Sequence, residues 1–291
     1  MSTHLERRTL LGAAGIGALA AMSKAGGGGG GGPLNPPPGA IEPTGRTLDE
    51  VYNRIPVPPA VGAYDGRIPI PGGVAPVTIS APGSYVLTGP LTVSTPGPAL
   101  RITTGNVSLD LNGQTVTNNS DNLGVYLTEF VRNVTVRNGQ ISGCAYGAYV
   151  SDFCLSVLLE DLMSFSPKRS GMFISGKSVR MRRCTVNDIG GGLAPDGFAR
   201  TGVLCVGNMC TIEECVFSKF NTAAPVPANL LSGVSVQGAA NLVERCVVSN
   251  ETAIAGSGVH MTGSGTFRHN CVMNLSTPYN TAGMVNGGGN V

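Results

Sequence analysis

Short alternations of apolar and variable residues recur along the chain, and most of them open with glycine. In Gly233-Val-Ser-Val the second and fourth residues are apolar, and Gly202-Val-Leu-Cys and Gly258-Val-His-Met repeat that form. Alternation of this kind predicts a short β-strand with one face in the core. Runs of this form begin at Gly124, Gly147, Gly171, Gly202, Gly233, Gly258 and Gly283.

The spacing of these runs predicts a repeat architecture. Their opening glycines recur at similar intervals along the chain, and a nearly regular period of this length is typical of coils that pack mainly on their neighbours. Within one repeat, the β-type runs 234–236, 241–243 and 246–248 are separated by a segment that contains Gly238 and by two charged residues. Three stacked strands per coil predict an all-β fold, a single-stranded right-handed parallel β-helix of about seven rungs over residues 66–291.

Four cysteines occupy the same step of their repeats, each as far from its opening glycine as Cys246 is from Gly233. Equivalent steps of neighbouring coils lie about 4.8 Å apart, so these cysteines are expected to form a ladder. A linear stack does not bring its thiolates to one point, which favours core packing over a metal site. Whether the chain's eight cysteines are reduced or form disulfides stays open. The ladder residues are Cys184, Cys215, Cys246 and Cys271.

Residues 1–65 follow other patterns. Arg7 and Arg8 precede an apolar run, so residues 1–25 are predicted to be a twin-arginine-type signal peptide for export, with a general secretion signal as the alternative. Residues 26–46, rich in Gly and Pro, predict a flexible linker. Apolar residues at helical spacing predict a short helical cap and connector over 47–65.

The charge of the chain argues against nucleic acid as a partner. Without Glu6, Arg7, Arg8 and Lys24 of the predicted signal, the remaining basic and acidic residues balance. A neutral chain lacks the basic footprint on which nucleic-acid binding depends. The apolar run of the signal is too short for a stable membrane anchor, so no membrane span is expected after its removal.

Three motifs resemble a known family. The stretches GSYVLTGPLTV (83–93) and VSLDLNGQTVT (107–117), together with repeated Glu-x-Cys-x-Val/Phe-Ser runs, are similar to secreted bacterial right-handed β-helix proteins of the pectin-lyase-like superfamily. The resemblance covers about residues 66–291 and implies the fold. It does not fix an activity, because that superfamily includes polysaccharide lyases, glycoside hydrolases, epimerases, phage tailspikes and binding proteins.

An outward stripe on the first strand of each coil supplies the candidate binding residues. The middle residue of the Gly-led runs points outward, and down the coils it reads Tyr126, Tyr149, Phe173, Leu204, Ser235 and His260. Aromatic faces in a row suit the C–H faces of sugar rings, so Tyr126, Tyr149 and Phe173 are predicted to bind substrate. Burial under the insertions or contact with a second subunit are the alternatives.

The two longest repeats contain insertions at 189–201 and 220–232. In the family that the chain resembles, loops at this turn wall a groove, so Asp188, Asp196, Arg200 and His260 form a candidate catalytic group. The paired-Asp and Gly-His-Gly motifs of that family are missing. No acidic cluster that would hold Ca²⁺ is visible in the sequence, so no cofactor is identified and Ca²⁺ is expected only if the protein is a lyase.

These patterns favour an exported protein, periplasmic, cell-surface or extracellular, that binds a polysaccharide. The first alternative is a polysaccharide lyase or glycoside hydrolase whose groove lies on the first-strand face between the two insertions. The second is a structural or assembly protein that self-associates through the aromatic stripe or through an open C-terminal rung.

Overall fold

The computed structural model describes residues 65–190, 200–220, 231–282 and 284–291. The chain divides into two units, Met1–Val57 and Pro58–Val291, and all described residues belong to the second. The predicted signal peptide (1–25), linker (26–46) and helical cap (47–65) lie outside the described residues, except for Asp65, and stay predictions. Within the described residues there is no helix long and apolar enough to cross a membrane.

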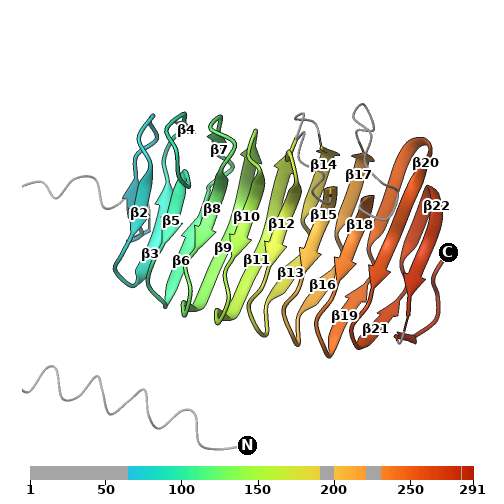
Figure 1. Ribbon diagram of the computed structural model, residues 1–291. Coiled ribbons are helices and arrows are strands. Elements are labelled where there is room, and N and C mark those ends of the chain that lie inside the picture. The colour runs from blue at the N-terminus through green and yellow to red at the C-terminus, as the bar shows by residue number, and fades with distance from the viewer. Residues whose placement is uncertain (1–64, 191–199, 221–230, 283) are drawn as a thin grey trace, which may run out of the picture. The chain divides into compact units, whose positions relative to one another are not determined.

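The second unit is a parallel β-helix with three faces (Figure 1), which confirms the predicted fold class. Every pairing between its 23 strands is parallel, and each strand pairs with its counterpart in the next coil. The first face holds β2 (Val77–Ile79), β5 (Leu100–Ile102), β8 (Leu123–Leu127), β10 (Tyr146–Val150), β12 (Ser170–Ile174), β15 (Arg200–Cys205), β18 (Leu231–Val236) and the C-terminal parts of β20 (Val247–Met261) and β22 (Cys271–Thr281).

The other two faces are built in the same way. The second face holds β1 (Ile68–Ile70), β3 (Gly83–Leu87), β6 (Val107–Asp110), the N-terminal parts of β9 (Arg132–Ser142) and β11 (Leu155–Phe165), β13 (Arg180–Arg182), β16 (Thr211–Glu213), β19 (Asn241–Glu244), β21 (Gly265–Arg268) and β23 (Val285–Asn286). The third holds β4 (Leu91–Val93), β7 (Thr115–Asn118), β14 (Thr185–Ile189), β17 (Val216–Phe220) and the remaining parts of β9, β11, β20 and β22.

The inward residues of the first face form two apolar stacks that run through the coils. Alternation along each strand sends the second and fourth residues of the Gly-led runs into the core. All of them are fully buried, so each coil removes apolar surface from water by covering its neighbour. One stack is Val125, Ala148, Met172, Val203, Val234 and Val259, and the other is Leu127, Val150, Ile174, Cys205, Val236 and Met261.

Close packing explains why glycine opens these runs. A Cβ at Gly202 would lie 2.2 Å from Cδ1 of Phe217, and one at Gly233 would lie 2.3 Å from Cγ1 of Val248. Both distances are far below a van der Waals contact, so only glycine lets the first strand pass the third-face side chain of its own coil. The glycine is therefore a packing requirement of the coil.

Nine strands stack on the first face of the described residues, where the Gly-led runs predicted about seven rungs. Glycine does not mark the outer coils: Pro278 stands opposite Gly258. The run at Gly283, predicted to start the last coil, does not do so, because Thr277 to Thr281 already occupy that place.

The cysteine ladder contains three of its four predicted members. Cys184, Cys215 and Cys246 are buried and stack on adjacent coils, and their carbonyls accept from Val216 (2.9 Å), Val247 (2.9 Å) and Cys271 (2.9 Å), respectively. Cys271 thus stands opposite Val247 and in register with Val216, one step beyond the ladder, and it is only half-buried.

An asparagine takes the fourth place of the ladder. The Asn270 side chain is fully buried, its Oδ1 accepts from the backbone N–H of Cys246 at 3.0 Å, and its Nδ2 donates to the carbonyl of Val243 at 3.1 Å. These two bonds satisfy a buried amide and hold the last coil one residue out of the predicted register. All eight cysteines are free thiols.

Candidate functional site

The predicted outward stripe is in register from coil to coil. Tyr149 lies opposite Tyr126 and Phe173, and the stripe continues through Leu204 and Ser235 to His260. The rings of Tyr149 and Phe173 are stacked with centroids 4.4 Å apart, and Tyr126 meets Tyr149 edge to face at 5.7 Å. These three residues therefore form one aromatic surface on β8, β10 and β12.

Tyr146, at the start of β10, extends this surface. Its ring lies 5.6 Å from that of Tyr149 and 5.7 Å from that of Phe173, edge to face in both cases. The guanidinium carbon of Arg169 lies 5.9 Å from the Tyr146 ring centroid, within the range of a cation–π contact. The guanidinium carbon of Arg101 lies 5.7 Å from the Tyr126 ring centroid, so four rings and two cations form a connected cluster.

Burial is the largest cause that raises the pKa of the Tyr149 hydroxyl, and Tyr146, Asp152 and Tyr126 raise it further. A phenol normally titrates near pH 10, so Tyr149 keeps its proton throughout the neutral range. Its hydroxyl can therefore donate a hydrogen bond to a ligand in the groove.

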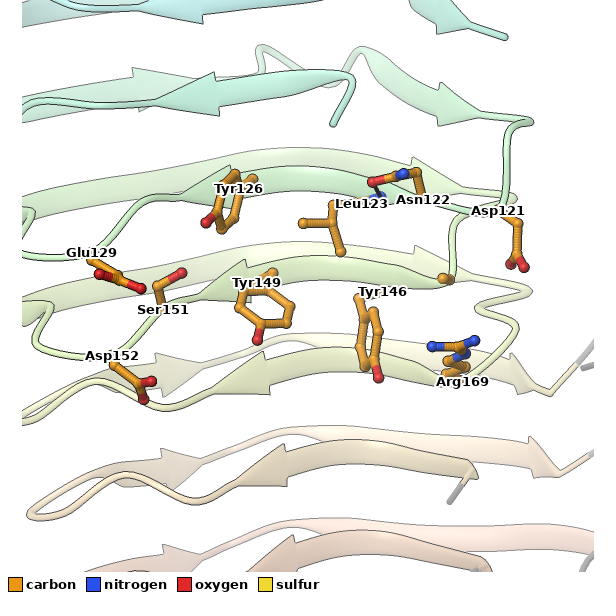
Figure 2. Close-up of a pocket in the computed structure, with 11 residues that line it drawn as sticks. Asp121, Asn122, Leu123, Tyr126, Glu129, Tyr146, Tyr149, Ser151, Asp152 and Arg169 are labelled. Atoms are coloured by element: carbon orange, nitrogen blue, oxygen red, sulfur yellow. Dashed lines mark hydrogen bonds between the residues drawn. The ribbon is translucent and has the colours of Figure 1, made fainter. Parts of the chain in front are cut away.

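A groove of about 430 Å³ lies over the rings of Tyr126, Tyr146 and Tyr149 and extends along the strands, while Phe173 is not part of its lining. Figure 2 shows Tyr126 and Tyr149 in its middle, Glu129, Ser151 and Asp152 toward one end, and Tyr146, Arg169 and Asp121 toward the other. The volume is within the range of small-ligand sites. The groove is lined by Asp121, Asn122, Leu123, Tyr126, Glu129, Ala145, Tyr146, Tyr149, Ser151, Asp152 and Arg169, and we call it the tyrosine groove.

The lining of the tyrosine groove carries more negative than positive charge. It contains the carboxylates of Asp121, Glu129 and Asp152 and the guanidinium of Arg169. Lys168 outside the lining pairs with Asp121 at 3.4 Å, and Ser175 donates a hydrogen bond to Asp152. A floor of tyrosine rings with hydrogen-bonding groups at both ends suits a ligand that has apolar faces and a hydroxylated rim.

Two turns of unusual length supply part of this lining. In the coils of β8 and β10, the turn to the second face takes five steps along the chain, from Leu127 to Arg132 and from Val150 to Leu155. The equivalent turn in the next coil takes three steps, from Ile174 to Lys177. Since the longer turns include Glu129 and Asp152, they place carboxylates beside the tyrosine groove.

The predicted catalytic residues do not meet in this groove. Asp196 lies outside the described residues. The side chain of Arg200 is buried against Gly190, where a Cβ would come within 2.6 Å of its Cδ. Asp188 accepts a hydrogen bond from Ser166 beside the third face.

His260 is half-buried at the far end of the stripe, between Ser235 and Asn280. Arg200 is two coils away from it and four residues back along the strand. That corresponds to about 10 Å across the coils and about 13 Å along the strand. The structure therefore does not bring His260 and Arg200 together as an acid–base pair.

A metal centre is also not apparent in the part of the chain that is described, where no group of three or more His, Cys, Asp and Glu side chains could hold an ion. The expectation that Ca²⁺ acts only in a lyase stays a prediction.

Sequence reasoning missed the charged and turn residues of the groove, although a pattern for them exists. Thr128-Glu129-Phe130 and Ser151-Asp152-Phe153 repeat the order hydroxyl, carboxylate and phenylalanine at the same step after Gly124 and Gly147. The later coils do not contain this triplet. The triplet is visible when the turns of adjacent repeats are aligned. The predicted catalytic group was instead based on the two long insertions, which belong to other coils.

Comparison with known proteins supports the fold. No protein-family model and no curated protein matches the sequence. Among solved structures, the chain is similar to an alginate lyase from Paenibacillus sp. str. FPU-7, with a TM-score of 0.51 and 15% sequence identity over 76% of this chain and 91% of that chain. At this identity the similarity shows a shared fold.

Proposed function

We propose that this chain is an exported β-helix protein that binds a polysaccharide in the tyrosine groove. The observation that carries the proposal is the cluster of Tyr126, Tyr146, Tyr149 and Phe173 on adjacent coils, with polar groups at both ends of the groove. Sugar rings have apolar C–H faces that pack on aromatic rings and hydroxyls that need hydrogen-bond partners. The similarity in fold to an alginate lyase supports a polysaccharide as the class of ligand.

The charges favour an uncharged sugar at this position. Glu129 and Asp152 stand at one end of the groove, whereas Arg169 lines the other end and Lys168 pairs with Asp121 there, so the carboxylate of an acidic sugar beside Glu129 and Asp152 would meet like charge. Carboxylates accept hydrogen bonds from sugar hydroxyls, and the protonated Tyr149 can donate one. A neutral sugar can use all of these groups.

A glycoside hydrolase is the second candidate, and one feature favours it. Glu129 and Asp152 project from equivalent turns of adjacent coils, where the N–H of Phe130 donates to the carbonyl of Asp152 at 3.4 Å. Equivalent positions of neighbouring parallel strands are about 4.8 Å apart, close to the separation of about 5–5.5 Å between the two carboxyls of retaining glycoside hydrolases. One carboxyl would protonate the leaving oxygen while the other attacks the sugar to form a glycosyl ester, and the first, now a carboxylate, would take a proton from the water that hydrolyses this ester.

Binding and cleavage can be measured in one experiment. The purified exported protein is incubated with galactomannan as a neutral polymer and alginate as an acidic one, with Ca²⁺ or with a chelator. Affinity electrophoresis reports retention of the protein, and assays for new reducing ends and for unsaturated products report hydrolysis and elimination. We expect retention by the neutral polymer.

Tyr149→Ala tests the site, with Leu204→Ala as the matched control on the same stripe. Loss of the stacked ring should weaken retention about tenfold, equivalent to about 1.4 kcal/mol, while Leu204→Ala should change it less than about twofold. Equal effects of the two substitutions, or no retention by either polymer, would refute the proposal. New reducing ends that disappear in both Glu129→Gln and Asp152→Asn would establish the hydrolase.

A further inference from the structure

Two phenylalanines beside the tyrosine groove are exposed together. Phe130 and Phe153 sit on the two longer turns, with 64% and 66% of their surface accessible. Their rings are stacked with centroids 5.0 Å apart and an interplanar angle of 5°. Apolar rings of this size are normally buried, so a stacked and exposed pair needs an explanation other than core packing.

The backbone under both rings is also unfavourable. Phe130 has φ 64° and Phe153 has φ 59°, in the left-handed region. Asn, Asp and Ser occupy many of the other left-handed positions in this chain, and a bulky side chain there is an outlier. Each phenylalanine keeps this unfavourable backbone conformation although its ring is exposed. Backbone strain of this kind is more common at functional sites than elsewhere.

These rings border a second groove of about 440 Å³ whose charge is opposite to that of the first. Its lining includes Arg132 and Lys177, which are exposed, together with the carboxylate of Asp152. Arg132 and Lys177 lie on either side of Leu155 in neighbouring coils. The lining therefore combines an aromatic pair with two cations, and we call it the phenylalanine groove.

The two grooves are adjacent. Asp152 lines both of them, and Ser175 in the phenylalanine groove donates a hydrogen bond to its carboxylate. The tyrosine groove runs along β8 and β10 toward the turns that carry the phenylalanines. A linear ligand that lies along these strands would pass from the tyrosine groove over Asp152 to Phe130 and Phe153.

We infer that the phenylalanine groove is a second subsite for the same polysaccharide and that it takes an acidic sugar. This inference rests on the function proposed above. The stacked rings offer an apolar platform for the sugar face, and Arg132 and Lys177 pair with its carboxylate. The ligand is thus a chain with both uncharged and acidic residues, and it lies along the strands, across the axis on which the coils stack.

Alginate oligosaccharides at three degrees of esterification test this charge pattern. The probes are the fully ionised form, a form with about half of its carboxyls converted to propylene glycol esters, and a fully esterified form. We expect the half-esterified form to bind roughly fivefold more tightly than either extreme, because only it supplies an uncharged sugar to one groove and a carboxylate to the other. Calorimetry at low ionic strength measures the three affinities.

Three variants locate the effect. Phe153→Asn removes a ring and puts a residue that tolerates the left-handed region in its place, and it should weaken binding of the half-esterified probe about fivefold. The double variant Arg132→Gln/Lys177→Gln should abolish the preference for that probe over the fully esterified form. Phe165→Asn is the matched control, since Phe165 is exposed on the third face, and it should leave all three affinities unchanged.

The outcomes separate the two proposals. If the fully esterified probe binds as tightly as the half-esterified one, or if the double variant keeps the preference, the acidic subsite is refuted while the tyrosine groove stands. If Tyr149→Ala has no effect on any probe, the proposed function itself is refuted. Concentration-dependent dimerisation that Phe153→Asn abolishes, without any effect on glycan binding, would make the phenylalanines a contact between copies and would overturn the inference.

Discussion

The coils of β8 and β10 and the coils of β15 and β18 present the same first-strand face with different chemistry. In the former pair, Tyr126 and Tyr149 stand on the stripe and the adjoining turns carry extra residues. In the latter pair, Leu204 and Ser235 occupy the same register, and the turn of the β15 coil is short. Two grooves lie on the described part of the β8 and β10 coils. The parallel backbone pairing beneath the stripe continues unchanged from these coils to those of β15 and β18.

This difference shows that a β-helix separates scaffold from site. The inward stacks and the opening glycines are alike in both regions, because each coil must pack on the next. Outward residues and turns are not constrained in that way, so a short extension of the turn is enough to place a carboxylate and a ring beside the strand. The following predictions test this separation, starting with the largest effect.

The scaffold of the two regions should respond alike to an added methyl group. A Cβ at Gly147 would lie 2.4 Å from the Gly171 carbonyl oxygen, and one at Gly233 would lie 2.3 Å from Cγ1 of Val248. Gly147→Ala and Gly233→Ala should each lower the free energy of unfolding by about 3 kcal/mol, which thermal melting would register as a fall in Tm of roughly 10 °C.

Gly89→Ala is the control for these two substitutions, since its Cβ would make an ordinary contact at 3.5 Å. Its Tm should stay within about 2 °C of that of the unsubstituted protein. Unchanged Tm values for Gly147→Ala and Gly233→Ala would show that the coils can move apart, contrary to the close packing described above.

Ligand binding should distinguish the two ends of the stripe. Tyr146→Ala removes a ring that contacts Tyr149 and Phe173, and we expect the Kd for the bound polymer to rise about tenfold. His260→Ala lies at the other end and should change the Kd less than about twofold. A larger rise in Kd for His260→Ala than for Tyr146→Ala would place the binding site near the coils that carry the long insertions.

Charge in the tyrosine groove should set the preference between polymers. Asp152→Asn and Glu129→Gln each remove a negative charge, so binding of fully ionised alginate should strengthen about threefold at low ionic strength. The gain should fall on addition of salt, which screens exposed charges. Glu251→Gln serves as control, because Glu251 is exposed, lies outside this groove and pairs with Lys219 at 3.2 Å; a similar gain in that variant would show that only net charge matters.

The cysteines should differ in their reaction with a thiol reagent at pH 8. Burial raises the pKa of Cys144 to about 12 and that of Cys154 to about 11, and only the thiolate reacts. Cys271 is half-buried, so mass spectrometry should find it labelled first. Because a raised pKa keeps the proton on the thiol, labelling of Cys144 should increase only as the pH approaches 12. Labelling of Cys246 before Cys271 would contradict the register described for the last coil.

The repeat made most of the fold predictable, and the same regularity explains the errors. The fixed step from glycine to cysteine was correct for Cys184, Cys215 and Cys246, but it failed at Cys271 because the last coil is one residue out of step and Asn270 forms two backbone hydrogen bonds there. The stripe residues Tyr126, Tyr149 and Phe173 lie together as their spacing predicted. The catalytic group chosen from the insertions was not brought together, since Arg200 is buried and distant from His260.

The sequence by itself determined the coil, because alternation and a fixed period specify which residues face inward and which lie above one another. Only the tertiary structure decided where a groove forms, since that depends on how the two longer turns project and on which side chains remain exposed beside them. Tyr146, Asp152 and Phe153 are ordinary surface residues in the sequence. They become neighbours of a groove because parallel strands about 4.8 Å apart place Tyr146 beside the start of β8 and place the two longer turns side by side.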